Sequence, residues 1–135
     1  MESLTVSRTL DATVDDVADV MGDTESFVRA SGYDEVRTEG GRLHIENRVG
    51  IANLELVARI VEEGPSLEYV QEEGIFEAMR TAYAVEEDDD GVTVTARTEF
   101  AVDAGIVGEF LDATVVKRQR RKELTTQLDY LEAHV

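Results

Sequence analysis

The sequence predicts an α+β domain in which a curved antiparallel sheet of about seven strands packs against one long C-terminal helix. Three observations lead to this fold class. Residues 3–10 alternate apolar and polar side chains like a strand, six further strand-like runs follow between residues 33 and 102, and residues 103–134 return to a helical period. A run of strands followed by a helix is typical of α+β domains. We expect residues 1–135 to form a single domain.

The first part of the chain predicts a strand and two short helices. Leu4, Val6 and Leu10 share one face of the strand, and Arg8 interrupts that face. The spacing of Thr13 and Asp16 is typical of a capping box, in which each residue hydrogen-bonds the backbone of the other at a helix start. We therefore expect one helix over residues 14–21 and a second over 24–30, with Gly32 ending the second.

Residues 33–102 predict the rest of the sheet. Turn residues separate six runs: YDEVRTE, RLHIENRV, NLELVARIVE, SLEYVQEE, IFEAMRTAYAVEE and VTVTARTEFAV. Their alternation is typical of antiparallel strands with one buried face. This pattern places several polar, aromatic or thioether side chains on the buried faces, which makes them candidates for lining a pocket: Asn47, Tyr69, Glu77, Met79, Tyr83, Thr98 and Phe100.

The C-terminal helix carries a basic patch, VVKRQRRKEL, in which residues 117–122 hold five of the thirteen basic residues. A helical wheel centred on Phe110, Leu124 and Leu128 places Lys117 and Arg121 within the apolar stripe, and puts Arg118, Arg120 and Lys122 at or beyond its margins, toward solvent or the rim. We expect the inner pair to face the sheet. Their charges could then escape to solvent, pair with an internal carboxylate such as Glu77, or bind the carboxylate of a ligand.

The composition restricts habitat and partners. Thirty acidic residues face thirteen basic ones, only two of them Lys, and the net charge is −17. This balance resembles that of proteins from salt-loving archaea, because molar salt screens the repulsion between carboxylates. Outside the basic patch eight basic residues face thirty acidic ones, so we expect no binding of nucleic acid. We also expect no leader peptide, no membrane span and a cytoplasmic location.

Several kinds of chemistry find no support in the residues. The chain has no Cys and only two His residues, which argues against disulfides, thiol nucleophiles and a metal site. It also lacks the serine-hydrolase, zinc-protease, phosphate-loop and dinucleotide-binding motifs, so we expect no cofactor. An acid/base enzyme built from Tyr83, Glu77 and Arg121 stays possible if burial shifts their ionisation.

Two segments resemble the START-like superfamily, also called SRPBCC or helix-grip proteins, which includes polyketide cyclase/dehydrase and lipid-transport domains. VSRTLDATVDDVADVMGDTESF is similar to the opening strand and first helices of that superfamily, and GIVGEFLDATVVKRQRRKELTTQLDYLEAHV is similar to its grip helix. Many relatives carry a Trp after the short helices, but this chain has no Trp, which leaves the subfamily open. The resemblance implies a cavity between sheet and helix that holds a hydrophobic small molecule.

The residues and the resemblance leave three functions open. The first is a carrier or sensor of a hydrophobic molecule (a lipid, isoprenoid or polyketide). The second is a cyclase/dehydratase-type enzyme, and the third is a protein-interaction module with a filled core. The sequence does not decide the oligomeric state. For the first function we expect ligand-binding residues from the strands and from the helix, namely Asn47, Tyr69, Glu77, Met79, Tyr83, Thr98, Phe100, Phe110, Lys117 and Arg121.

Overall fold

The α+β prediction is confirmed by a computed structural model, which describes residues 1–49, 51–102 and 113–135. Seven strands, two short α-helices, a 3-10 turn and a long C-terminal helix occur in the described residues. In chain order they are β1 (Glu2–Leu10), α1 (Val14–Met21), α2 (Thr24–Arg29), β2 (Glu35–Glu39), β3 (Arg42–Val49), β4 (Ala52–Glu62), η1 (Gly64–Ser66), β5 (Glu68–Glu73), β6 (Phe76–Asp88), β7 (Gly91–Val102) and α4 (Ala113–His134).

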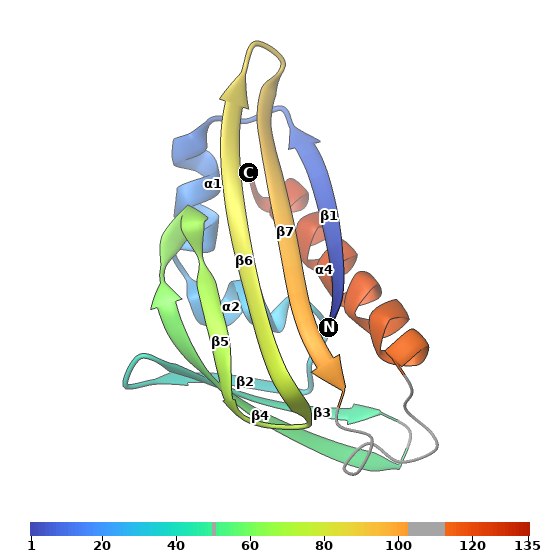
Figure 1. Cartoon of the computed structure of the whole chain (residues 1–135). Coiled ribbons are helices and arrows are strands. Elements are labelled where there is room, and N and C mark those ends of the chain that lie inside the picture. The colour runs from blue at the N-terminus through green and yellow to red at the C-terminus, as the bar shows by residue number, and fades with distance from the viewer. Residues whose placement is uncertain (50, 103–112) are drawn as a thin grey trace.

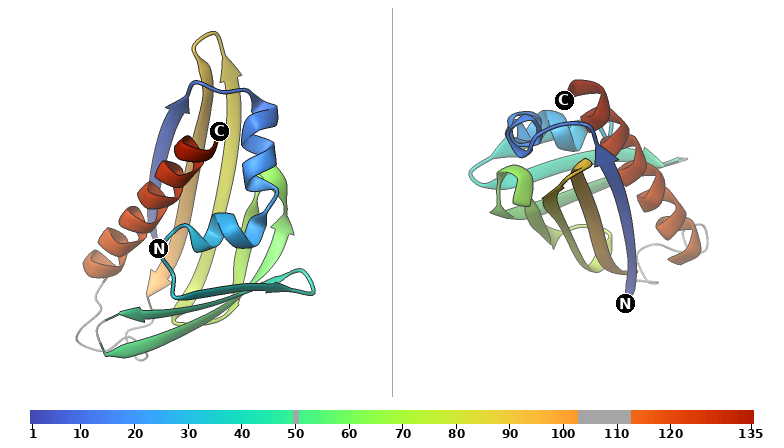
Figure 2. Two further views of the ribbon diagram at one scale, coloured as in Figure 1. Left: turned by 180° about the vertical axis from the view of Figure 1, so that it is seen from behind. Right: turned by 90° about the horizontal axis from the view of Figure 1, so that it is seen from above.

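The strands form one antiparallel sheet in the order β1-β7-β6-β5-β4-β3-β2. β1, β7 and β6 run nearly side by side, whereas β2, β3 and β4 cross below them, so the sheet bends strongly along its length (Figure 1). The three helices lie on the same side of this bent sheet, with α4 running along β1 (Figure 2). This is the helix-grip arrangement.

The short helices begin and end as the sequence predicts. The Thr13 hydroxyl accepts a hydrogen bond from the backbone N–H of Asp16 at 3.1 Å, and the Asp16 carboxylate accepts one from the N–H of Thr13 at 3.1 Å. Asp23 caps α2 in a similar way, because its carboxylate accepts from the N–H of Ser26 at 3.2 Å. Gly32 follows α2 with φ of 101°, a conformation that other residues rarely adopt.

The C-terminal half of α4 closes a filled core. Leu124, Leu128 and Leu131 of α4 are buried against the sheet and the short helices. Arg8, which interrupts the apolar face of β1, is explained by an ion pair with Asp129 of α4. Within the described part of the chain, no helix combines the length and the apolar composition needed to cross a membrane.

A cavity between the sheet and the long helix

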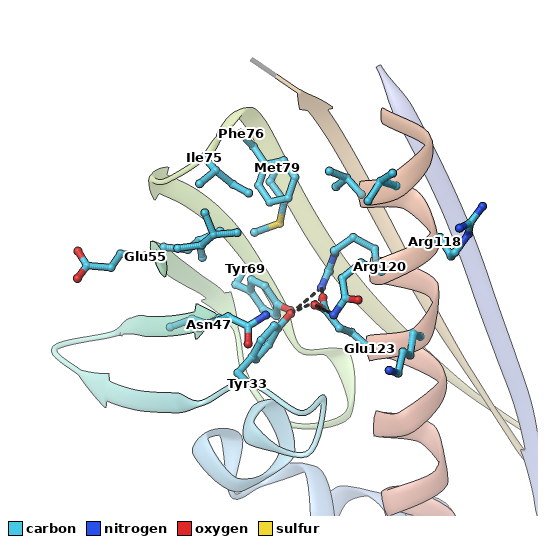
Figure 3. Close-up of a pocket in the computed structure, with 17 residues that line it drawn as sticks. Tyr33, Asn47, Glu55, Tyr69, Ile75, Phe76, Met79, Arg118, Arg120 and Glu123 are labelled. Atoms are coloured by element: carbon cyan, nitrogen blue, oxygen red, sulfur yellow. Dashed lines mark hydrogen bonds and ion pairs between the residues drawn. The ribbon is translucent and has the colours of Figure 1, made fainter. Parts of the chain in front are cut away.

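A cavity of about 360 Å³ lies between the sheet and the N-terminal half of α4 (Figure 3). This volume falls within the range typical of small-molecule sites. Its apolar wall comes from β3, β4, the β5–β6 turn, β6 and α4, and consists of Ile45, Leu54, Leu56, Ile75, Phe76, Met79, Val115 and Val116. Exposed lining residues, among them Glu55 on β4 and Arg118 and Lys122 on α4, mark the rim of the cavity.

A β-bulge in β6 shapes the apolar wall. The pairing with β7 shifts between Phe76 and Ala78, so one extra residue, Glu77, sits in β6 at this point. Phe76 and Met79 are both buried on the cavity side, although a regular strand would place residues three apart on opposite faces. The bulge therefore directs two large apolar side chains to the cavity and turns Glu77 to solvent.

Arg120 of α4 lies at one side of the cavity and is only 6% exposed. Its Nη1 donates to Glu123 Oε1 and to the Tyr33 hydroxyl, both at 2.7 Å. Its Nη2 donates to the hydroxyls of Thr81 at 2.9 Å and Thr98 at 3.2 Å, which belong to β6 and β7. These contacts compensate for the removal of the guanidinium charge from water.

Glu123 and Tyr33 complete this network. Glu123 is 5% exposed, and its Oε1 accepts the Tyr33 hydroxyl proton at 2.9 Å. Its Oε2 accepts from the Gln119 side chain at 3.1 Å. The carboxylate thus neutralises Arg120 and is itself hydrogen-bonded on both oxygens. Among the buried side-chain atoms of the described residues, Arg120 Nε is without a hydrogen-bond partner, and neighbouring groups cover it.

Burial and the neighbouring groups hold Arg120 and Tyr33 each in one protonation state at neutral pH. Burial raises the pKa of Tyr33 well above its ordinary value, although the nearby charge of Arg120 opposes the effect. Burial acts to lower the pKa of Arg120, but Tyr33, Tyr69 and Glu123 around the guanidinium outweigh it and raise the pKa well above its ordinary value. Arg120 therefore stays charged, and Tyr33 keeps its proton at neutral pH.

A second buried chain of hydrogen bonds runs beside the first. Gln127 of α4 donates from Nε2 to the backbone carbonyl of Phe27 at 3.0 Å, and its Oε1 accepts the hydroxyl proton of Tyr83. Burial raises the pKa of Tyr83 well above its ordinary value, and the neighbouring Tyr69 acts in the same direction. The ring of Tyr83 also packs edge-to-face on Phe27, with the centroids 5.4 Å apart.

A comparison with known protein families shows to which family the chain belongs. The family model described as "Polyketide cyclase / dehydrase and lipid transport" matches residues 1–135. The chain belongs to this polyketide cyclase/dehydrase and lipid transport family. No curated protein sequence matches it.

Solved structures similar to this family member share its fold at low sequence identity. A START superfamily protein from Mycobacterium smegmatis has a TM-score of 0.73 and 10% identity, over 98% of this chain and 96% of its own. The Zhui aromatase/cyclase from a Streptomyces species has a TM-score of 0.73 and 16% identity, over 97% and 93%. TTHA0849 from Thermus thermophilus has a TM-score of 0.73 and 13% identity, over 98% and 96%. These likenesses support the helix-grip fold.

In this family member, the strand residues predicted for the site fall into three groups. Asn47, Tyr69 and Met79 line the cavity. Tyr83, Thr98 and Phe100 are buried as expected but do not line it, because they lie in the filled part of the core. Glu77 is exposed, and the expectation that it shares the buried face of Met79 and Tyr83 is wrong because of the bulge. The acid/base arrangement of Tyr83, Glu77 and Arg121 is therefore not assembled.

The orientation predicted for the basic residues of α4 is also wrong. Arg121 is exposed, and Lys117 is half-buried with its Nζ 3.7 Å from Glu2 of β1; both lie on the β1 side of the helix, outside the cavity. Arg120, placed at the margin by the wheel, is the buried one. Phe110, on which the wheel was centred, lies outside the described residues.

The wheel misplaced these residues because three of the seven buried residues described in α4 are polar: Arg120, Glu123 and Gln127. At about 100° per residue, Arg120 and Gln127 lie about 40° and 60° from Leu124 on one side, whereas Arg121 lies about 60° away on the other. A wheel centred on apolar residues alone is therefore rotated toward Arg121. Arg120, Glu123 and Tyr33 were missed, and the signal that could have found them is the i, i+3 spacing of Arg120 and Glu123, which suits an ion pair on one helix face.

Proposed function

We propose that this protein binds a hydrophobic small molecule in the cavity beside α4 and acts as its carrier or sensor. The observation that supports the proposal is the apolar wall of the 360 Å³ cavity, interrupted by polar groups only at one end and at the rim. An apolar ligand would gain about 25 cal/mol for each Å² of its surface removed from water. Family membership points in the same direction.

The two alternatives are less well supported. An interaction module with a filled core would leave no space of this size between the sheet and α4. A proton-transferring enzyme needs groups that change protonation near neutral pH, whereas the raised pKa values of Tyr33 and Tyr83 keep both phenols protonated. We therefore propose binding without chemical conversion, and the absence of a metal or cofactor stays part of the proposal.

The exposed cations of α4, Arg118, Arg121 and Lys122, lie on a molecule of net charge −17, so we propose that nucleic acid is not a partner. We also propose a cytoplasmic location.

The test is direct binding of an apolar fluorescent probe, N-phenyl-1-naphthylamine, to the purified protein. We expect saturable binding with enhanced fluorescence. Leu56→Trp narrows the cavity and should weaken probe binding by about tenfold or more, because overpacking an apolar site costs about 1–3 kcal/mol. The matched control is Ile60→Trp, which changes a half-buried residue of the same strand outside the cavity.

Mass spectrometry of a denatured sample would add a second reading. An apolar molecule that co-purifies with the wild type and is depleted in Leu56→Trp but not in Ile60→Trp supports the proposal. Equal probe binding by the wild type and both variants would place the probe elsewhere and contradict it.

A further inference from the structure

The cavity has a polar end, formed by Tyr33, Asn47, Tyr69, Arg120 and Glu123. Figure 3 shows Asn47 of β3, Tyr69 of β5 and Tyr33 directing their polar atoms toward the Arg120–Glu123 pair, while the apolar side chains of the β5–β6 turn and of β6 lie at the other end. A ligand that fills the cavity therefore meets hydrocarbon along most of its length and hydrogen-bonding groups at one end. Which of these groups are still without a partner determines what the ligand must offer there.

Three members of the polar end have their hydrogen-bonding capacity used within the protein. Arg120 donates both Nη1 hydrogens to Tyr33 and Glu123, and both Nη2 hydrogens to Thr81 and Thr98. Glu123 accepts on both oxygens. The Tyr33 hydroxyl accepts from Arg120 and donates to Glu123. Recognition of a ligand at this end therefore falls to the two remaining residues, Asn47 and Tyr69.

Tyr69 has a buried hydroxyl that is not committed to the protein. The residue is only 2% exposed and lines the cavity. Within residues 1–49, 51–102 and 113–135, no side chain or backbone group forms a hydrogen bond with this hydroxyl, and the neighbouring Tyr83 gives its own proton to Gln127. The Tyr69 hydroxyl can therefore both donate to and accept from a molecule in the cavity. A buried polar side chain without a partner in the protein points to a ligand or to water as its partner.

Asn47 is in the same situation on a different strand. Its side chain is half-buried and lines the cavity, and no described residue hydrogen-bonds its carboxamide. The amide can donate from its nitrogen and accept on its oxygen. A hydrocarbon that filled the polar end would displace the water that serves Asn47 and Tyr69 and would return no hydrogen bond, which is unfavourable. A ligand with an oxygen atom at this end replaces the water with its own hydrogen bonds.

We infer that the ligand carries an oxygen function, a carbonyl or a hydroxyl group, at one end of an apolar body, and that Asn47 and Tyr69 hydrogen-bond this oxygen. The ligand then lies with its oxygen toward the Arg120–Glu123 pair and its apolar body against Phe76 and Met79. The inference rests on the proposed function and narrows it from hydrophobic molecules in general to oxygenated ones bound in one orientation. Asn47 and Tyr69 are its specificity-determining residues.

The experiment compares two competitors of nearly the same shape, 4-tert-butylacetophenone and 1-tert-butyl-4-isopropenylbenzene. The second has a methylene group in place of the carbonyl oxygen. Both displace N-phenyl-1-naphthylamine, and the ratio of their affinities is compared between the wild type and Tyr69→Phe, so that the different solubilities of ketone and alkene cancel. We expect Tyr69→Phe to weaken the ketone about tenfold relative to the alkene, the order of one hydrogen bond in a buried site. The corresponding alcohol, 1-(4-tert-butylphenyl)ethanol, is measured in the same way.

Two further variants test Asn47 and provide the control. Asn47→Leu should lower the affinity for the ketone relative to the alkene, because the leucine side chain cannot donate to the oxygen. Tyr130→Phe is the matched control for Tyr69→Phe, since Tyr130 is a half-buried tyrosine of α4 that does not line the cavity. It removes a phenol hydroxyl elsewhere and should leave the affinity ratio unchanged.

The carbonyl stretch of the bound ketone gives a reading that a merely structural role of Tyr69 would not change. A hydrogen bond to a carbonyl oxygen weakens the C=O bond and lowers its stretching frequency. The band is obtained as the infrared difference between complexes of unlabelled and isotope-labelled ketone. We expect it at lower frequency in the wild type than in Tyr69→Phe, and unchanged by Tyr130→Phe.

The outcomes distinguish this inference from the proposed function. Failure of the probe to bind, or binding that Leu56→Trp does not weaken, removes both. If binding depends on Leu56 but neither Tyr69→Phe nor Asn47→Leu lowers the affinity of the ketone or of the alcohol relative to the alkene, the inference is wrong while the proposed function stands. A loss in only one of the two variants overturns the role assigned to the other residue.

Discussion

Arg120 and Arg121 are neighbours in the sequence, yet Arg120 is buried between α4 and the sheet while Arg121 is exposed on the β1 side of the helix. The two positions carry the same side chain on the same helix and differ in their surroundings. They therefore form a natural matched pair for measuring what the buried network contributes.

The first prediction concerns the Arg120–Glu123 pair. Glu123→Leu leaves the guanidinium buried without its counter-charge, and we expect a loss of about 3–5 kcal/mol in the free energy of unfolding, measured with urea. The double variant Arg120→Met/Glu123→Leu should recover much of that loss, because no charge is left buried. Arg121→Met, the control, should stay within about 0.5 kcal/mol of the wild type. A single variant as stable as the wild type would contradict the buried pair.

The second prediction concerns Gln127. Tyr83→Phe removes the proton that Gln127 Oε1 accepts, leaving a buried acceptor without a partner. We expect a cost of about 1–3 kcal/mol in the free energy of unfolding. The double variant Tyr83→Phe/Gln127→Leu no longer contains the unpaired oxygen. We expect its loss in the free energy of unfolding to be smaller than the sum of the losses of the two single variants, although the Phe27 carbonyl then loses its donor. Strict additivity of the two changes would mean that they do not interact.

A third prediction follows from the raised pKa values of Tyr33 and Tyr83. A phenol whose pKa is higher in the folded state binds its proton more tightly there, so its contribution to stability is complete below the ordinary pKa of 10.0 and is lost as the pH rises above it. We expect the free energy of unfolding to fall on the alkaline side of that value. The chain has four Tyr and no Trp, so absorbance of tyrosinate should show part of the tyrosines ionising only as the protein unfolds.

The fourth prediction concerns the capping box of α1. Thr13→Ala removes the acceptor for the N–H of Asp16, and we expect a loss of about 1 kcal/mol in the free energy of unfolding. Thr13→Ser keeps the acceptor and should retain most of the stability. Equal losses in the two variants would show that the methyl group of Thr13, and not its hydroxyl, is responsible.

The fifth prediction concerns salt. With a net charge of −17, exposed carboxylates such as those of the β6–β7 hairpin repel one another at low ionic strength. Screening becomes strong at molar salt, where the Debye length is about 3 Å. We expect the melting temperature to rise between dilute buffer and molar sodium chloride. A melting temperature that does not change over this range would contradict the interpretation of the acidic surface as an adaptation to salt.

The sequence predicted the fold because its signals are local. Alternation in the strands, the Thr13–Asp16 spacing and the helical period predicted for residues 103–134 each depend on neighbouring residues. The described elements follow these signals, with α4 over Ala113–His134, and residues 103–112 lie outside the described part of the chain. The site was predicted only in part. Alternation placed Asn47, Tyr69 and Met79 correctly because Asn47 and Tyr69 lie in regularly paired stretches of β3 and β5, and Met79 lies in the regular part of β6 that follows the bulge.

The misses have two physical sources. Glu77 was misplaced because a single extra residue in β6 changes which face each neighbour occupies, and alternation carries no mark of it. Arg120 was misplaced because burial of a charge depends on partners from distant strands, Thr81 and Thr98, which a wheel of one helix does not contain. Both errors concern long-range pairing.

The extra residue in β6 also divides that strand for any future redesign. Before the extra residue an even-numbered position, Phe76, faces the interior. After it the odd-numbered positions Met79, Thr81 and Tyr83 do so. A library of variants intended to change which ligand the cavity accepts should therefore vary Phe76 together with Met79 and keep Glu77 unchanged. Removing Glu77 would bring the two segments into phase and rotate one of these side chains out of the wall, so a one-residue deletion there would rebuild the chamber more thoroughly than a point substitution.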